Sequence, residues 1–453
     1  MQFSRELILQ QAPDASSAKA AQGLLSLSKW QTLGVNERAV WGECKGSGSK
    51  PYQVQIDLEA LAFKCSCPSR KFPCKHGLAL ALLRAEQSTA FTDTELPAWV
   101  GEWLQSRQQR AEKQEQKKAE APTVKRADDA AVSAKRLQRM QAGLDELERW
   151  LQDQVTQGLA TLIGNEDAFE QLAARMVDAQ LPGVAYRLRP LAGVLNSGVV
   201  DGVDWPLRLL GAFGRLQLMI DGFRRLDSLP PAERADLSQA LGLPLSKDDV
   251  IGQGEACVDQ WHVQGQYVEE EDRLLMRRVW LRGLNSGRMA LLQDYAHGSR
   301  QFEQVFVTDS VLDAELAFYP GAWPQRAVLA AAPTVLEQAV PVIPCPAHEA
   351  FDTVATALAA NPWQAPQPIS IDDGVPELDP HLGWMLRITG PEGDSQVPLA
   401  IDKRDAWMLC AVAGGRALRV FSEWHQGVDG SYLQPLAAWQ GQTLVWCAWE
   451  TIA

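Results

Sequence analysis

Three cysteines and one histidine gather within twelve residues near the start of this 453-residue chain. Cys65 and Cys67 are separated by one residue, and Cys74 and His76 follow with the same spacing. Residues i and i+2 of an extended strand share a face, so the first two thiols can point at one metal ion. The prolines between the two pairs favour a turn that returns the second pair to the same point. Because three thiolates and an imidazole fill a tetrahedral shell, the spacing predicts a structural Zn²⁺ site.

Two other interpretations of these four residues stay open. They could hold an iron–sulfur cluster, or they could be ordinary buried cysteines beside a solvated histidine. Four soft ligands rarely fall so close together by chance, which favours a metal site. A second and weaker candidate site combines Cys345 and His348 with Cys257 and His262. These two pairs lie far apart in the sequence, so a proline-rich loop with incidental residues is the preferred interpretation there.

The pattern C-x-C-x6-C-x-H at 65–76 resembles the SWIM-type zinc finger, with all four ligand positions filled. The flanking sequences WGECKGSGSKPYQVQIDL (41–58) and FKCSCPSRKFPCKHGLALALL (63–83) are also similar to those of bacterial SWIM proteins. The resemblance covers about residues 30–85. It implies a strand–hairpin–helix fold around one zinc ion, with the finger at about 52–85, that binds DNA or other proteins. Bacterial proteins of this kind often occur alongside AAA+ ATPases of the MoxR group and von Willebrand factor A proteins, which are therefore the expected partner classes.

The charge around the predicted finger is basic, although the whole chain has a net charge of −13. No Asp or Glu occurs between residues 60 and 85, and five cations do. These are Lys64, Arg70, Lys71, Lys75 and Arg84. They could contact phosphates, or they could stabilise the net negative charge of a zinc ion bound to three thiolates. Residues 1–140 hold 21 basic and 15 acidic residues, whereas the rest of the chain holds 22 and 41.

This charge distribution favours a protein partner over nucleic acid. The acidic body would repel a long duplex, and the helix expected after His76 is apolar rather than rich in base-reading side chains. An acidic patch on a protein could meet Arg70, Lys71 and Lys75, with Phe72 as an apolar anchor between them. We therefore expect a protein-interaction module or adaptor. A nucleic-acid-binding regulator that uses the basic face of the finger is the alternative.

Composition and periodicity predict a multidomain α+β protein, with 46% apolar and 22% charged residues. An N-terminal domain with a small zinc-stabilised ββα-like module is expected over 1–104. A charged flexible linker rich in Gln, Lys, Arg and Glu follows over 105–139. A helical region is expected over 140–278 and a β-rich half over 279–453. The proline-rich stretch at 362–380 is a candidate division of that half.

Several signals argue against catalysis and against a membrane location. The sequence GSGSKP at 46–51 lacks the ending of a phosphate-binding loop, and four protein ligands leave a metal no open position for a substrate. No apolar segment is long enough to span a bilayer, and the N-terminus lacks the apolar core of a signal peptide. The dispersed cysteines predict a reducing cytoplasm. The sixteen Trp residues fit core packing better than an aromatic binding groove.

Overall fold

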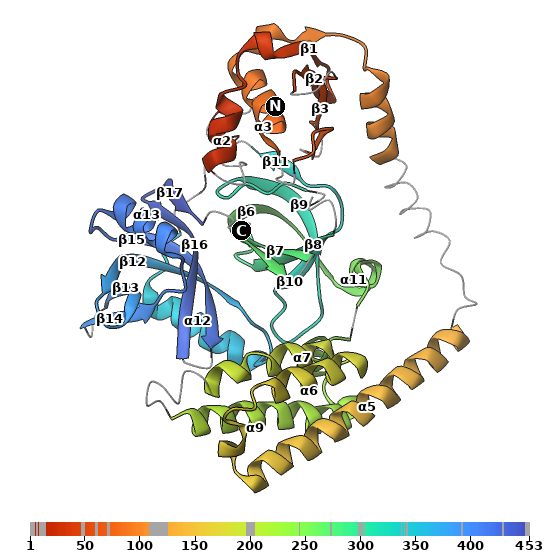
Figure 1. Cartoon of the computed structure of the whole chain (residues 1–453), viewed down its shortest axis with the longest axis vertical. Coiled ribbons are helices and arrows are strands. Elements are labelled where there is room, and N and C mark those ends of the chain that lie inside the picture. Colours follow the sequence, from red (N-terminus) through yellow and green to blue (C-terminus); the bar gives the residue numbers. More distant parts are fainter. Residues whose placement is uncertain are drawn as a thin grey trace.

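The protein is described here from a computed structural model of the whole chain (Figure 1). The structure describes residues 5, 8, 15–46, 50–58, 62–69, 73–107, 126–195, 204–243, 245–271, 274–297, 302, 304–336, 338, 340, 343–390, 393–427 and 430–448. In chain order, these residues form an N-terminal domain, a helix bundle and two β-sheet domains. This is the multidomain α+β architecture that the sequence predicts.

The N-terminal domain is a five-stranded sheet covered by helices. Its strands are β1 (Trp30–Val35), β2 (Ala39–Cys44), β3 (Tyr52–Asp57), β4 (Ala62–Cys65) and β5 (Thr92–Asp93), in the order β4-β3-β2-β1-β5. The helices α2 (Ala15–Gln22) and α3 (Lys75–Glu86) pack against it. The leucines of α3 from Leu78 to Leu83 are buried, since the helix lies between the sheet and α2. The hairpin β3–β4 followed by α3 gives the expected strand–hairpin–helix order.

A second small core extends this domain beyond residue 97. Residues 98–107 are helical, and Val100 and Leu104 pack on Trp41 of β2. Arg107 also approaches Asp57 within 3.4 Å. The beginning of the expected linker at 105 is therefore packed helix rather than free chain.

The helix bundle begins earlier than the sequence predicts. It consists of α5 (Arg126–Gln157), α6 (Asp167–Asp178), α7 (Pro182–Leu188), α9 (Trp205–Arg224) and α10 (Pro231–Leu241). Because α5 starts at Arg126, residues 126–139 are helix and not the end of a linker; the stretch 108–125 lies outside the described residues. From Met140 onward α5 buries Leu144, Leu147 and Leu151, which share one helix face. These side chains form the largest core of the molecule with Phe169, Leu216 and other residues of the bundle.

The first β domain also starts earlier than expected. After α11 (Lys247–Gln253), its strands are β6 (Glu255–Glu271), β7 (Leu274–Gly283), β8 (Met289–His297), β9 (Val311–Phe318), β10 (Arg326–Leu329) and β11 (Thr334–Leu336). The prediction of helix up to residue 278 is therefore wrong from Glu255 onward. The order is β10-β8-β7-β6-β9-β11, and β10 pairs with β9 as well as β8, so the sheet closes on itself. Trp261, Leu281 and Phe318 fill its interior.

The second β domain is an antiparallel sheet with two helices. Its strands are β12 (Gln367–Asp379), β13 (Gly383–Gly390), β14 (Gly393–Pro398), β15 (Leu418–Gly427), β16 (Gly430–Gln440) and β17 (Thr443–Cys447), in the order β14-β13-β12-β15-β16-β17. The helices α12 (Ala347–Ala360) and α13 (Lys403–Ala413) contribute to its core. The expected division at 362–380 is wrong in detail, since most of this stretch is the strand β12. The β-rich half divides instead before α12.

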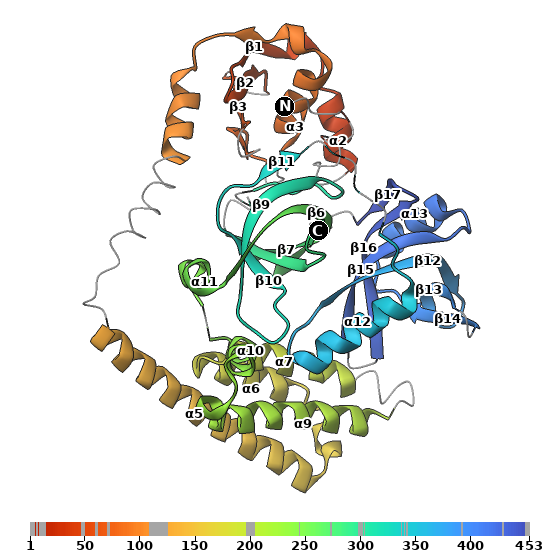
Figure 2. The ribbon, with the colours of Figure 1, turned by 180° about the vertical axis from the view of Figure 1, so that it is seen from behind.

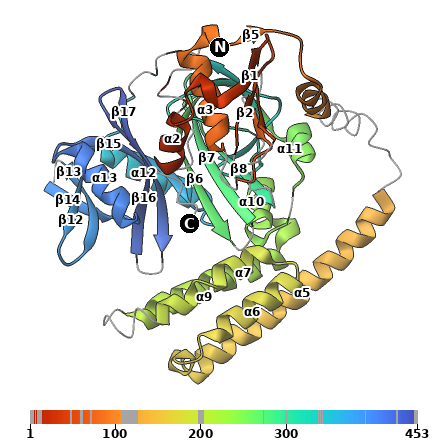
Figure 3. The same ribbon diagram turned by 45° about the horizontal axis from the view of Figure 1, so that its top comes forward.

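The four parts have a definite arrangement in space. The N-terminal domain and the helix bundle lie at opposite ends of the first β domain (Figures 1 and 2). The second β domain lies beside the first, as the tilted view also shows (Figure 3). The aromatic side chains of Trp280, Phe421 and Trp439 pack in a core between the two β domains. None of the helices in the described part of the chain has the length and hydrophobicity that a membrane span requires.

Candidate metal centre

The end of β4 positions the first two thiols. Cys65 is the last residue of β4 and pairs with Val54 of β3. The next residue, Ser66, is fixed by two hydrogen bonds to Gln53. Its backbone N–H donates to the Gln53 carbonyl at 3.0 Å, and its hydroxyl accepts from the Gln53 N–H at 2.9 Å. The backbone is thus held at Cys65 and Ser66, directly before Cys67, and the sulfurs of Cys65 and Cys67 lie close together.

The start of α3 positions the other two ligands. Cys74 is the N-cap residue, and its sulfur accepts a hydrogen bond from the Gly77 backbone N–H at 3.5 Å. The partial positive charge of a helix N-terminus favours a thiolate there. His76 lies in the first turn of α3, only 5% exposed, with its ring 5.0 Å from that of Tyr52 on β3. The histidine ring is therefore held by packing before any ion binds.

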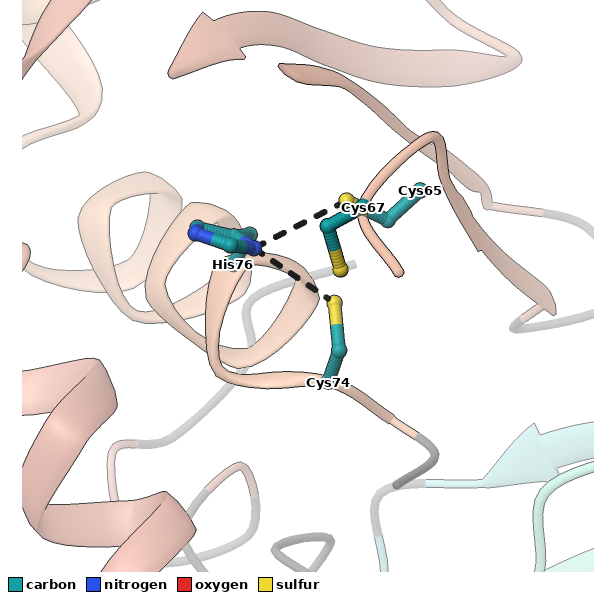
Figure 4. A group of neighbouring side chains, drawn as sticks. All are labelled: Cys65, Cys67, Cys74 and His76. Atoms are coloured by element: carbon teal, nitrogen blue, oxygen red, sulfur yellow. Dashed lines mark hydrogen bonds between the residues drawn. The ribbon is translucent and has the colours of Figure 1, made fainter. Parts of the chain in front are cut away.

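The four ligand atoms lie close enough together for one ion (Figure 4). The three sulfurs and a ring nitrogen of the histidine all lie within 4.8 Å of one another. The Nδ1 atom of His76 is 3.8 Å from the Cys65 sulfur and 4.0 Å from the Cys74 sulfur. Zinc–sulfur bonds of about 2.3 Å in a tetrahedron separate the sulfurs by roughly 3.8 Å. The residues thus fit a zinc-type metal with only a small contraction of the site.

The pKa values of the three thiols indicate which protons a bound ion must displace. Hydrogen bonding with Cys67 and Cys74, together with burial, raises the pKa of the Cys65 thiol. The hydrogen bond with Cys65 instead holds the pKa of Cys67 far below its ordinary value. The bond with Cys65 lowers the pKa of Cys74, but the bond with Cys67 and burial raise it to about 11. A metal ion that binds all three sulfurs must therefore displace the protons that the raised pKa values favour on Cys65 and Cys74.

Comparison with protein-family models gives two matches on this chain. Residues 52–85, which include the whole ligand set, match the SWIM zinc finger. The chain carries a SWIM zinc finger. Residues 135–241 match the SWIM-associated four-helix bundle domain, which corresponds to the helix bundle from α5 to α10. Comparisons with curated proteins and with solved structures found no match.

The structure does not assemble the second candidate metal site. Among the described residues, the finger is the only place where three or more metal-ligating groups gather. His262 instead contacts Asp309 at 2.9 Å and the side chain of Gln264. Cys345 accepts a hydrogen bond from Arg282 at 3.6 Å. The candidate pairs at 257–262 and 345–348 therefore have other partners in this fold.

The predicted partner-binding residues lie mostly outside the described chain. Arg70, Lys71 and Phe72 are not among the described residues, and Lys75 is exposed at the first position of α3. Beside Lys75 the SWIM finger has a hollow of about 520 Å³, which the sequence did not indicate. Lys45 and Tyr52 line this hollow together with His76 and Cys67. Lys45, directly after β2, was the available signal, but only the pairing of β2 with β3 brings it beside the metal centre.

Proposed function

We propose that this protein is a non-enzymatic zinc-binding adaptor whose SWIM finger holds a protein partner. The observation that carries the proposal is the set of four convergent ligands, Cys65, Cys67, Cys74 and His76. Four protein ligands complete the tetrahedral shell of Zn²⁺ and leave no position for a substrate or a reactive water. The ion would stabilise the hairpin β3–β4 against α3. A reducing cytoplasmic location belongs to the same proposal, because the three thiols must stay reduced to bind metal.

The hollow beside the metal centre is the surface that we assign to the partner. Lys75 has no acidic partner among the described residues, and the Lys45 ammonium donates only to the Ser28 carbonyl, at 2.8 Å. Lys29 lies close by, since it and Lys75 both lower the pKa of the Cys44 thiol against the raising effect of burial. Tyr52 adds an aromatic wall. Cations around an aromatic residue suit an acidic segment of another protein.

The partner classes to test first are those that the resemblance implies, a MoxR-type AAA+ ATPase and a von Willebrand factor A protein. Nucleic acid is the alternative partner, favoured by the absence of acidic residues between positions 60 and 85. The strongly acidic remainder of the chain opposes nucleic-acid binding, because a duplex that approaches the finger would also meet the negative electrostatic field of the remainder.

Charge-reversal variants separate these two proposals. The variant Lys45→Glu/Lys75→Glu alters the hollow, whereas Lys247→Glu/Lys403→Glu makes the same charge change at exposed helix starts of other domains. Proteins captured from native lysate should be lost with the first variant, kept with the second, and unaffected by nuclease. The nucleic-acid-binding regulator would be supported instead by two results together. The protein would bind duplex or single-stranded DNA at near-physiological salt, and the first variant would abolish this binding without the loss of any captured protein.

A further inference from the structure

A cleft lies where the helix bundle meets the two β domains, far from the SWIM finger. Its volume is about 410 Å³, within the range of small-molecule sites. Its walls come from α7 and α10 of the bundle, from β7 and β8, and from the connection between α12 and β12. Figures 1 and 2 show the helix bundle below β10, with α12 of the second β domain to one side. Junctions between domains are common places for ligand sites.

The walls of this junction cleft are joined by hydrogen bonds between the domains. Asp236 on α10 accepts from the Asn361 side chain at 2.8 Å and from the Ala322 backbone N–H at 2.9 Å. Gln239, one turn further, donates to the Pro320 carbonyl at 2.7 Å. These bonds join the bundle to both β domains, so the cleft exists before a ligand enters. A preformed cleft lowers the entropic cost of binding.

Two arginines in the cleft have no acidic partner among the described residues. Arg187 on α7 donates to three backbone carbonyls, those of Gly183, Ala240 and Trp363, at 2.8 to 3.1 Å. These carbonyl oxygens accept from three of its five N–H groups without neutralising its charge, and burial lowers its pKa. Arg326 lies over the ring of Tyr319, 4.4 Å from the centroid, with no ion pair. Arg278, which also lines the cleft, does have an acidic partner, since it forms an ion pair with Glu423 at 2.7 Å.

Large aromatic side chains around these arginines are left open to solvent. Tyr186, next to Arg187 on α7, is 72% exposed, and Tyr295 on β8 is 49% exposed. Trp323 and Trp363 are partly exposed and also line the cleft. Aromatic faces in a concave site gain from stacking on a flat ring. Guanidinium groups match the paired oxygens of a carboxylate or a phosphate.

We propose that the junction cleft binds a small organic anion that carries a flat ring. The anionic group lies at Arg326 and Arg187, and the ring lies against the exposed aromatic side chains. Carboxylate and phosphate are the two sources of such a charge, and the experiment separates them. This site is independent of the partner surface on the finger, so it goes beyond the proposed function.

Ligand-observed NMR on the full-length, zinc-loaded protein tests this proposal with four probes. The probes are adenosine monophosphate, indole-3-carboxylate, adenosine and inorganic phosphate. At least one of the two ring anions should bind at millimolar concentration, and which one binds identifies the anionic group. The uncharged nucleoside and the ringless anion should each bind about tenfold more weakly, since each loses one of the two contacts. If neither ring anion binds, or if adenosine binds as well as its monophosphate, the proposal is wrong.

Matched arginine variants locate the binding. Arg326→Gln should weaken the bound ring anion about tenfold, because it removes a charge-assisted contact. Arg288→Gln is the control, since the Arg288 guanidinium also lies over an aromatic ring, 3.9 Å from the centroid of Phe318. Arg288 lies outside this cleft and forms an ion pair with Glu255. This control variant should leave binding unchanged. Tyr186→Ala serves as a second variant, because so exposed a ring contributes little to folding, and it should weaken the same probe. Unchanged binding in both Arg326→Gln and Tyr186→Ala would overturn the assignment.

Discussion

Replacing Glu423 with Gln should destabilise the joint between the two β domains. Glu423 lies on β15, fully buried, and accepts hydrogen bonds from Arg278 at 2.7 and 2.8 Å and from the indole of Trp280 at 2.8 Å. Both donors lie on β7 of the other domain. The neutral amide keeps the shape of the side chain but leaves the buried charge of Arg278 with only the half-exposed Glu269 nearby. The perturbation is therefore electrostatic rather than steric.

The magnitude follows from the titration of the same carboxyl. Burial raises the pKa of Glu423, but hydrogen bonds from His425 and Arg278 outweigh it and bring the pKa from 4.5 to about 2. At about 1.4 kcal/mol per pH unit, this shift corresponds to about 3 to 4 kcal/mol of unfolding free energy. Breaking a buried ion pair from one side costs a similar amount. For a β body of this size, we expect the melting temperature to fall by about 10 °C.

The sign of the pH dependence provides the strictest test. A carboxyl with a lowered folded-state pKa stabilises the protein above its unfolded pKa and loses that contribution as the pH falls through its folded pKa. The difference between wild type and Glu423→Gln should therefore be full at neutral pH and shrink between about pH 4.5 and pH 2. Urea unfolding followed by tryptophan fluorescence measures it. Glu377→Gln is the control, because its pair with Arg387 is solvent-accessible and should contribute nothing measurable. A neutral-pH loss below about 1 kcal/mol, or a difference that persists at pH 2, would refute the reasoning.

Three further results are expected. Cys74→Ser should reduce bound zinc from about one ion per chain to a small fraction, measured by elemental analysis, and should abolish the separate melting of the N-terminal domain; unchanged zinc content would exclude Cys74 as a ligand. Metal affinity, measured by chelator competition, should fall as the pH is lowered from about 8 to about 6, because the thiols with raised pKa values, Cys65 and Cys74, hold protons that the ion must displace. Leu144→Ala should cost the helix bundle about 2 to 5 kcal/mol in denaturant unfolding through a buried cavity, whereas Val155→Ala on the exposed side of α5 should cost almost nothing; equal effects would contradict the packing described for this helix.

The metal centre could be predicted because its four ligands lie close together in the sequence. Cys65, Cys67, Cys74 and His76 lie on one hairpin end and one helix start, so their spacing alone limits where their side chains can point. The predicted order of strand, hairpin and helix was confirmed for the same reason. The hollow around Lys45 and the junction cleft could not be predicted in this way. They arise where elements from distant parts of the chain meet.

The strand β6 was missed although its sequence alternates, with Trp261, Val263 and Tyr267 separated by polar residues. Residues 261–265 are all buried, since Trp261 and Val263 point into the closed sheet while Gly265 packs on Leu436 and Phe421 of the second β domain. The opposite face is polar but also covered, since His262 and Gln264 are buried. The register also shifts between Val263 and Gly265, which interrupts the period of two.

The strand β12 was predicted as a connection because it contains prolines. Its first part, up to Gly374, pairs with β15, and its second part, from Gly374 onward, pairs with β13. Pro368 lies in the first part and Pro376 in the second, so each proline occupies a stretch that is paired on one side. A proline is tolerated in such a position, since it has no N–H to leave unpaired on the open side. The proline count alone could not reveal this change of neighbour within one strand.

The opposite placement of the SWIM finger and the helix bundle has a consequence for assembly. Both lie at the ends of the β body, with the closed sheet between them (Figures 1 and 2). A compact molecule seated on the finger leaves the bundle uncovered, and one seated on the bundle leaves the finger uncovered. Two such molecules could therefore bind at the same time, one to the finger and one to the bundle, without competing for the same surface. The chain therefore has the layout of a spacer, in which the closed sheet separates the surface of the finger from that of the bundle.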